Sequence, residues 1–224
     1  WPLARGAGSQ RLLASGEFPT LDGRARMIPI QPAATVTADA KRPLILNTGR
    51  LRDQWHTMTR TAKSPRLTAE ATEPVIDINP ADAGNCALEE GALARIESDQ
   101  GVLIARVHVT EAQSQGSLFA PIHFSDRFAS DARVGSLIVP VCDPISGQPE
   151  LKQTPVSAIP FDAAWHGFAL SREPIEIIGA DWWARAQAAG HQHTEFAGND
   201  VPEDWDLWAR SILGELHGGG EWLA

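Results

Sequence analysis

The stretch that decides the fold of this chain is PLILNTGRLRDQWHTMTR, residues 43–60. Its apolar start, Pro43 to Leu46, predicts a short buried strand that breaks at Asn47-Thr48-Gly49. The loop beyond the break carries three arginines, a Trp and a His. Arginine forks and hydroxyl groups suit phosphate oxygens, and aromatic rings suit a flat partner. We therefore expect this stretch to hold part of a large phosphorylated cofactor.

The composition limits the kind of protein to which this stretch can belong. The chain has 224 residues, 43% hydrophobic and 21% charged, so it can bury a sizeable core in one large or two small domains. A net charge of -9 and a pI near 5.2 argue against a nucleic-acid or anionic-membrane partner, because both need clustered positive surface. The basic residues that do cluster are a local exception: Arg50, Arg52, Arg60, Lys63 and Arg66.

The ends and the cysteines of the chain bear on where it works. The start, Trp1-Pro2-Leu3, resembles no signal peptide, and no apolar run is long enough to cross a membrane, so we expect a cytoplasmic protein. The absence of an initiator Met indicates a fragment or a processed piece. Cys86 and Cys142 form no CxxC pattern and are expected to be small buried residues rather than metal ligands.

Short β-prone runs separated by turns follow the opening strand. Val75 to Ile78 is the next run, and Pro80 after Asn79 predicts the start of a short helix that closes at Gly91. Ala92 to Ser98 and Val102 to Val109 form the clearest hairpin. The remaining β-prone runs are Gly116–His123, Leu137–Val141 and Val156–Ile159. We also expect an edge strand in the arm, at Met27–Ile30. The spacing is too small for repeated βαβ units and predicts a mainly β fold that closes into a barrel.

The two ends of the chain differ in composition from this β-rich part. We expect residues 1–40 to form an irregular arm, residues 41–160 the barrel, and residues 161–224 a Trp-rich, partly helical extension. In the extension, Asp181 to Ala189 predicts a short helix, and a second helix runs from the Asn199 to Pro202 cap to about Leu216. The second helix has an apolar stripe that should pack on the rest of the chain, or else on a partner.

The polar residues of the opening stretch can be assigned chemical roles. Thr48 and Thr57 supply hydroxyls, Gly49 lets the backbone approach a phosphate, and Arg50 offers a forked contact. Trp55 and His56 can stack on or edge a ring system. The alternative is a polar loop with solvated arginines and a buried Trp.

A second polar group lies near the end of the β-rich part. Asp143 can accept from a ring amine, and Lys152, after a Ser-Gly-Gln-Pro turn, can reach a phosphate or a ring oxygen. The alternative is a turn with a surface ion pair. His191 and His193 have no further ligands near them in the sequence, so we expect no metal site there.

Three motifs in order give the chain a family resemblance. NTGR with DQWHTMTRT (residues 47–50 and 53–61), PADA (80–83) and DPISGQPELK (143–152) resemble the molybdopterin-dinucleotide-binding domain at the C-terminal end of molybdenum oxidoreductases. The DQWHTMTR run and the QPELK ending look most like bacterial assimilatory nitrate reductase. The match covers about residues 15–175 and is strongest over residues 42–160.

The resemblance implies a six-stranded double-psi β-barrel. The barrel would contact one of the two molybdopterin guanine dinucleotide molecules that surround the metal in the cofactor Mo-bis-MGD. It implies cofactor contacts at Thr48, Gly49, Arg50, Gln54, Trp55, His56, Thr57, His123, Asp143 and Lys152, and no catalytic residue in this chain. It also implies nitrate as the substrate, the remainder of a catalytic subunit as the partner, and an iron–sulfur cluster in that remainder. The sequence names no electron donor.

Two departures from the family pattern keep alternatives open. Gly135 stands where the family usually has an Asn, and Phe124 follows His123 where the family usually has Trp. The alternatives are the same domain from another molybdenum or tungsten enzyme, such as a formate dehydrogenase, and a barrel module that has lost the cofactor. Gly135 is the observation that favours the last of these.

Overall fold

The computed structural model describes residues 11, 13–29 and 36–213, and the chain divides into two units, Trp1–Ala34 and Thr35–Ala224. In the first unit, residues 13–29 form turns and bends without helix or strand, as the sequence predicted for the arm. The strand predicted at Met27–Ile30 is wrong for residues 27–29, and Ile30 lies outside the described residues. No strand among the described residues pairs with residues 27–29, and Met27 and Ile28 are exposed.

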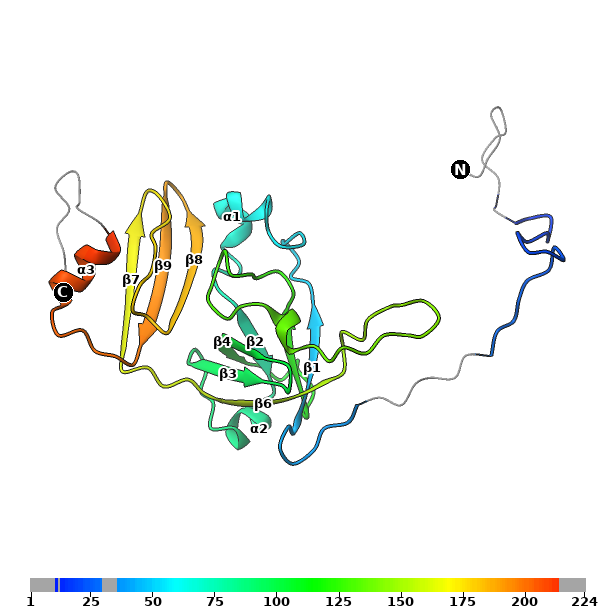
Figure 1. The fold of residues 1–224 in the computed structure, drawn as a ribbon, viewed down its shortest axis with the longest axis horizontal. Helices are drawn as coiled ribbons and strands as arrows, with labels where there is room; N and C mark the ends of the chain where they lie inside the picture. Colours follow the sequence, from blue (N-terminus) through cyan, green and yellow to red (C-terminus); the bar gives the residue numbers. More distant parts are fainter. Residues whose placement is uncertain (1–10, 12, 30–35, 214–224) are drawn as a thin grey trace. The chain divides into compact units, whose positions relative to one another are not determined.

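Six strands of the second unit close into a barrel (Figure 1). Their spatial order is β1-β5-β2-β4-β3-β6. The bounds are β1 (Leu44–Gly49), β2 (Val75–Ile78), β3 (Leu93–Glu97), β4 (Val102–Val109), β5 (Ser117–Pro121) and β6 (Thr154–Pro160). The pairs β1–β5 and β2–β4 are parallel, and the other four, including the closing pair β1–β6, are antiparallel. The predicted mainly β fold with a six-stranded double-psi barrel is confirmed.

Alternating side chains fill the barrel. Leu44 and Leu46 of β1 and Ile76 and Ile78 of β2 are buried, while the residues between them are less so. They join one core cluster with Leu118 of β5 and inward residues of the other strands. Each large apolar side chain buried in this way stabilises the fold by roughly 1.5–3 kcal/mol relative to an exposed position. Closure also leaves no barrel edge open for pairing with another chain.

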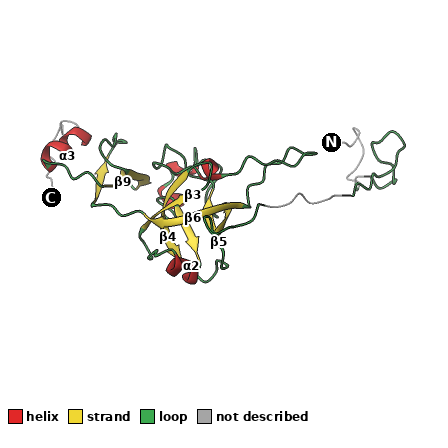
Figure 2. Ribbon diagram, turned by 60° about the horizontal axis from the view of Figure 1, so that its bottom comes forward, coloured by secondary structure: helices red, strands yellow, loops and turns green. Residues whose placement is uncertain are grey.

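Short helices connect the strands and lie outside the barrel. They are η1 (Thr61–Lys63), α1 (Pro65–Thr68), α2 (Pro80–Asn85) and η2 (Val134–Leu137). The predicted helix after Asn79 is α2: the Asn79 side chain accepts from the Ala81 N–H over 3.0 Å, and Pro80 occupies the first turn. Figures 1 and 2 show α2 at one end of the barrel.

The C-terminal part adds a three-stranded antiparallel sheet. Its order is β7-β9-β8, with β7 (Trp165–Ser171), β8 (Trp182–Ala188) and β9 (His191–Gly198). The helix predicted at Asp181–Ala189 is therefore wrong. Burial alternates along β8, with Trp182, Ala184 and Ala186 buried, because every second residue faces the barrel. Pairing of the whole of β8 with β9 overrides the helix preference of the Ala-rich sequence.

A second core cluster joins this sheet to the barrel. Trp182, 1% exposed, packs with Leu93 of β3 and Ile104 of β4, and the same cluster includes Met58 and Phe124 from loops. Backbone bonds add to the contact, since the Ser130 N–H donates to the Trp183 carbonyl over 2.9 Å. The sheet is thus a packed layer of the second unit.

The predicted second helix is α3 (Trp205–Leu213), and residues beyond 213 lie outside the described part. Trp205 and Trp208 both pack edge-on against Trp165 of β7, with ring centroids 5.3 and 5.0 Å apart. Trp208 also meets Phe196 of β9 at 5.5 Å. The apolar stripe therefore packs within the chain at these two positions.

Two further expectations need correction. The strand predicted at Leu137–Val141 does not form: Leu137 ends η2, and Pro140 has no N–H for a ladder. Of the two cysteines expected to be buried, Cys86 is half-buried against the barrel core, whereas Cys142 is exposed on the loop between η2 and β6.

Candidate functional site

The loop after β1, residues 50–60, has a defined path. Its backbone bonds include Met58 N–H to the Trp55 carbonyl at 2.9 Å and Ala62 N–H to the Met58 carbonyl at 3.0 Å. His56 and Met58 both have positive φ, 46° and 58°, a conformation that side chains other than Gly rarely adopt. Met58 is 2% exposed and belongs to the second core cluster, so the loop is anchored to the interior.

Gln54 supports the loop from inside. Its Nε2 donates to the Leu67 carbonyl over 2.6 Å, and its Oε1 accepts from the Thr61 hydroxyl over 2.7 Å. The side chain is buried, and both ends of its amide are engaged within the protein. Gln54 therefore ties the loop to η1 and to α1.

His123 lies beneath the same loop, two residues after β5. It is fully buried, its Nε2 accepts from the Leu51 N–H over 2.9 Å, and its Nδ1 contacts the His56 carbonyl at 2.5 Å. The parallel pairing of β1 with β5, which sets Gly49 opposite Pro121, brings His123 alongside the loop. Both ring nitrogens are used by the loop backbone.

Four of the predicted residues instead face outward from the loop: Arg50, Trp55, His56 and Thr57. Trp55 is 58% exposed, which is unusual for so large an apolar ring. The Arg50 guanidinium carbon lies 5.9 Å from the Trp55 ring centroid, and His56 meets the same Trp edge-on at 4.6 Å. A cation, two rings and a hydroxyl thus share one solvent-facing surface, which we call the loop surface.

The structure joins Lys152 to the end of β1. The Thr48 hydroxyl donates to the Leu151 carbonyl over 2.8 Å, and Lys152 Nζ donates back to the Thr48 carbonyl. Gly49 follows at once, and a side chain there would meet the Phe119 ring at 2.5 Å, so only Gly fits. Lys152, 104 positions further along the sequence, is therefore held beside Thr48, which directly precedes Gly49 and Arg50.

Asp143 lies on the long loop that leaves the barrel between η2 and β6 (Figure 1). Its Oδ1 accepts from the N–H groups of Ser146 at 2.7 Å and Ile145 at 3.0 Å, which closes a turn. These bonds, that of the Ser146 N–H first, lower the pKa of Asp143 below its ordinary value. Within the described residues, no hydrogen bond or ion pair connects Asp143 with the loop surface.

An ion network that the sequence analysis missed links the barrel to the added sheet. Arg106 of β4 pairs with Glu73 and with Glu195 of β9, each at 2.8 Å, and its guanidinium lies 5.3 Å from the Trp182 ring centroid. Burial raises the pKa of Glu73, and Arg106 works in the opposite direction. No sequence signal could have found this network, because its members are 33 and 89 positions apart.

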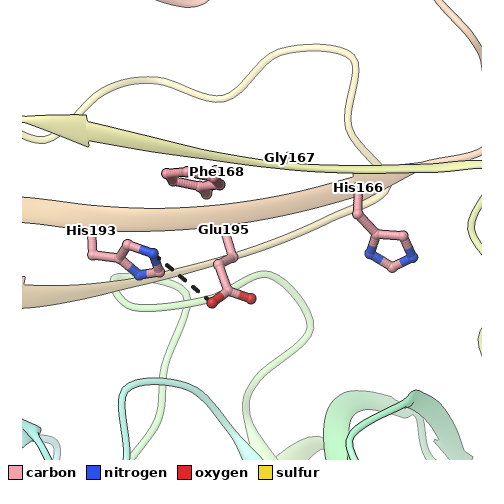
Figure 3. Close-up of a pocket in the computed structure, with 5 residues that line it drawn as sticks. All are labelled: His166, Gly167, Phe168, His193 and Glu195. Atoms are coloured by element: carbon pink, nitrogen blue, oxygen red, sulfur yellow. Dashed lines mark ion pairs between the residues drawn. The ribbon is translucent and has the colours of Figure 1, made fainter. Parts of the chain in front are cut away.

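A separate shallow hollow of about 310 Å³ lies on the C-terminal sheet, lined by His166, Gly167, Phe168, His193 and Glu195 (Figure 3). The ring of Phe168 stacks on that of His193 at 6.0 Å, and His193 Nε2 lies 4.0 Å from the Glu195 carboxylate. None of its residues belongs to the predicted set. Across the described ranges, no group of three or more His, Cys, Asp or Glu side chains is arranged to hold a metal ion.

None of the helices that the structure describes, of which α3 with nine residues is the longest, is long and apolar enough to cross a membrane.

A closed six-stranded barrel with a braced loop that presents an arginine, two rings and a hydroxyl places the chain in the class of β-barrel domains. The family model described as "Molydopterin dinucleotide binding domain" matches residues 44–155. The chain belongs to the molybdopterin dinucleotide binding domain family.

The chain is also similar to parts of longer enzymes. It is 44% identical over 206 residues to a nitrate reductase of Klebsiella oxytoca, a match that covers 92% of this chain and 23% of that protein. It is 32% identical over 154 residues to a formate dehydrogenase subunit alpha of Methanocaldococcus jannaschii, covering 68% and 22%. It is 33% identical over 132 residues to the assimilatory nitrate reductase catalytic subunit of Bacillus subtilis, covering 59% and 18%. The chain thus spans less than a quarter of the length of these relatives.

The loop surface fits such a cofactor. A dinucleotide carries a pyrophosphate, and the exposed Arg50 guanidinium is a suitable partner for it. The dinucleotide also carries flat rings, and the exposed Trp55 ring is a suitable partner for these. The positive side chain stands out in a chain with a net charge of -9.

Proposed function

We propose that this chain is the cofactor-binding C-terminal portion of a molybdenum-dependent nitrate reductase. In the reaction, nitrate takes up two electrons and two protons and becomes nitrite and water. The observation that carries the proposal is the loop surface, in which Arg50, Trp55, His56 and Thr57 face outward on a braced loop. The 44% identity to a nitrate reductase favours nitrate over other substrates.

The ten predicted residues take two kinds of role in this proposal. Arg50, Thr57 and Lys152 bind phosphate or polar ring atoms, Trp55 and His56 contact the pterin, and Asp143 binds from the long loop. Thr48 and Gln54, which are buried and hydrogen-bonded inside the protein, support the loop, Gly49 leaves space for the Phe119 ring, and His123 lies beneath the loop. The cofactor is molybdopterin guanine dinucleotide, one of two around the metal, and it supplies the redox chemistry that removes an oxygen atom from nitrate. The chain itself binds the cofactor, orients it and screens it from solvent.

The rest of the catalytic subunit is the partner of this chain in the proposal. The relatives are more than four times longer than the part they share with it, which leaves room for the metal ligand and for an iron–sulfur cluster elsewhere. We also propose division into an arm (1–40), a barrel (41–160) and a C-terminal extension (161–224). The family match over residues 44–155 supports the middle part.

Nitrate assimilation in the cytoplasm is the setting that we propose. It is supported by the similarity to an assimilatory nitrate reductase catalytic subunit.

A second candidate function is that of a formate dehydrogenase. Its support is the 32% identity to a formate dehydrogenase subunit alpha. A barrel without cofactor is a third candidate, supported by Gly135, whose missing side chain offers no contact.

The function can be tested on the complete enzyme that contains this chain. We expect it to reduce nitrate with a reduced viologen dye as electron donor and not to oxidise formate. Formate oxidation without nitrate reduction would favour the formate dehydrogenase candidate. A purified enzyme that lacks molybdenum and molybdopterin would favour the barrel without cofactor.

The loop surface can be tested with Arg50→Ala. Because a charge-assisted phosphate contact is worth roughly 1.5–3 kcal/mol, we expect the molybdenum content per enzyme to fall severalfold, as measured by elemental analysis. Arg52→Ala is the matched control, since the Arg52 side chain is 78% exposed and pairs with Asp53 and Glu70. Full molybdenum content in Arg50→Ala would reject the role of Arg50.

A further inference from the structure

His123 stands apart from the other predicted residues because it is the one fully buried imidazole beneath the loop. Its side chain is 0% exposed and contacts the backbone of the loop at two points, the Leu51 N–H and the His56 carbonyl. Its place follows from the fold: the Ile122 N–H donates to the Gly49 carbonyl over 2.9 Å, which sets His123 beside the start of the loop.

The two contacts define the protonation of the ring. The Leu51 amide can only donate, so Nε2 must accept and carries no proton. The His56 carbonyl can only accept, so Nδ1 must carry the proton. His123 is therefore a neutral imidazole in the Nδ1–H form.

The same contacts hold the loop backbone beside the exposed side chains. Arg50 directly precedes Leu51, and His56 lies between Trp55 and Thr57, so one buried ring fixes the backbone next to each of these side chains. His56 has a φ of 46°, and such a conformation persists only where its surroundings hold it. The hydrogen bond from His123 Nδ1–H to the His56 carbonyl is a contact that holds His56 in this conformation.

We propose that His123 is a positioning residue that holds the loop surface in its binding shape through the neutral Nδ1–H ring, without touching the cofactor. This inference rests on the proposed function, because it assumes that the loop surface receives the dinucleotide. It differs from the expectation from the family resemblance, in which His123 contacts the cofactor itself.

The protonation form can be measured on the full 224-residue chain with no cofactor present. Long-range nitrogen–proton NMR spectra distinguish the Nδ1–H, Nε2–H and charged imidazole forms. We expect the Nδ1–H form for His123 at neutral pH. Either of the other forms would overturn the inference.

Loop holding can be measured by amide hydrogen exchange. In His123→Phe, which keeps a ring but loses both hydrogen bonds, we expect the Leu51 and Met58 amides to exchange roughly tenfold faster or more. Amides within the barrel, such as that of Leu118, should keep their protection. Ile76→Val is the control, because it weakens the barrel core without touching the loop. Unchanged exchange of Leu51 in His123→Phe would contradict the inference.

Binding decides whether this role serves the cofactor. Isolated molybdopterin guanine dinucleotide is titrated into the wild-type chain and into two variants, His123→Phe and His123→Asn. The dissociation constant is measured for each. We expect His123→Phe to bind roughly tenfold more weakly, and His123→Asn, whose amide can still donate to the His56 carbonyl, to recover part of that loss. Equal affinity of His123→Phe and the wild type for the dinucleotide would overturn the inference. Weaker binding by His123→Asn than by His123→Phe would also overturn it, because ring packing rather than hydrogen bonding would then hold the loop.

The failure of the proposed function has a different signature. In that case the wild-type chain binds no dinucleotide, although His123 has the Nδ1–H form and Leu51 loses protection in His123→Phe. The link between His123 and the cofactor would then fall with the proposed function.

Discussion

At the scale of single residues, the structure separates side chains that one motif had presented as equivalent. Trp55 is largely exposed while its neighbour Gln54 is buried, with both ends of its amide engaged inside the protein. A sequence motif marks a region as special but does not show which members face a ligand. The loop surface consists of the members whose side chains the protein does not use for its own hydrogen bonds.

Gly135 offers a test of binding at this scale. It is exposed in η2, its φ is outside the left-handed region, and a side chain there would meet nothing within 4 Å. We expect Gly135→Asn to tighten binding of molybdopterin guanine dinucleotide up to roughly tenfold, because one neutral hydrogen bond contributes about 0.5–1.5 kcal/mol. Trp fluorescence during titration measures the affinity.

The matched control for that substitution is Gly84→Asn in α2, where a side chain also has open space. An equal effect of both substitutions, or none from Gly135→Asn, would show that position 135 does not face the cofactor.

Asp143 gives a prediction for the pH dependence of its turn. The Ser146 and Ile145 N–H groups favour the charged carboxylate and lower its pKa, so their stabilising effect is present above the ordinary Asp pKa of about 3.9. It is lost only as the pH falls through the lower value in the folded protein. The turn should therefore stay closed at pH 4, as followed by the amide NMR signal of Ser146. A transition centred at or above pH 3.9 would contradict this.

At the scale of elements, the added sheet depends on contacts between residues far apart in sequence. Arg106 of β4 serves Glu73 and Glu195 together. Because burial raises the pKa of Glu73, the stabilising contribution of this group is present at low pH and is lost as the pH rises through the folded value. At neutral pH the charged Glu73 is tolerated because Arg106 faces it.

Two substitutions in this network should differ strongly. Glu73→Gln removes a carboxylate whose charge burial disfavours and leaves Arg106 paired with Glu195, so it should change the free energy of unfolding by no more than about 1 kcal/mol at pH 7. Arg106→Met leaves the Glu73 and Glu195 carboxylates without a cation and should cost about 3–5 kcal/mol. Urea unfolding at pH 7 measures both, and similar values for the two variants would disprove this account.

At the scale of the whole molecule, the barrel and the C-terminal sheet share the second core cluster. Trp182 from β8 covers Leu93 and Ile104 on the outside of the barrel, and Met58 of the candidate site packs in the same cluster. The barrel is therefore closed as a sheet yet relies on the extension to cover one of its outer faces. The family match ends at residue 155, whereas the similarity to the Klebsiella oxytoca nitrate reductase extends over 92% of the chain.

A chain that ends at Pro160 tests this dependence. It exposes the apolar face that Trp182 covers, so we expect a melting temperature lower by more than about 5 °C, since 1 kcal/mol corresponds to about 2–4 °C in a domain of this size. Loss of protection at the Met58 amide should accompany it. Differential scanning calorimetry and hydrogen exchange measure the two effects, and an unchanged melting temperature would show that the barrel is independent of the extension.

The sequence by itself determined the six barrel strands and the position of the loop after β1, because alternation and turn residues act over a few neighbouring positions. Tertiary structure alone decided that Asp181–Ala189 is a strand, since its pairing with β9 outweighs the helix preference of its alanines. It also decided that His123 lies inside the loop, because only the parallel pairing of β1 with β5 brings a residue 72 positions from Leu51 into contact with it. Local patterns carry no information on such distant pairs, and these pairs give the loop surface its shape.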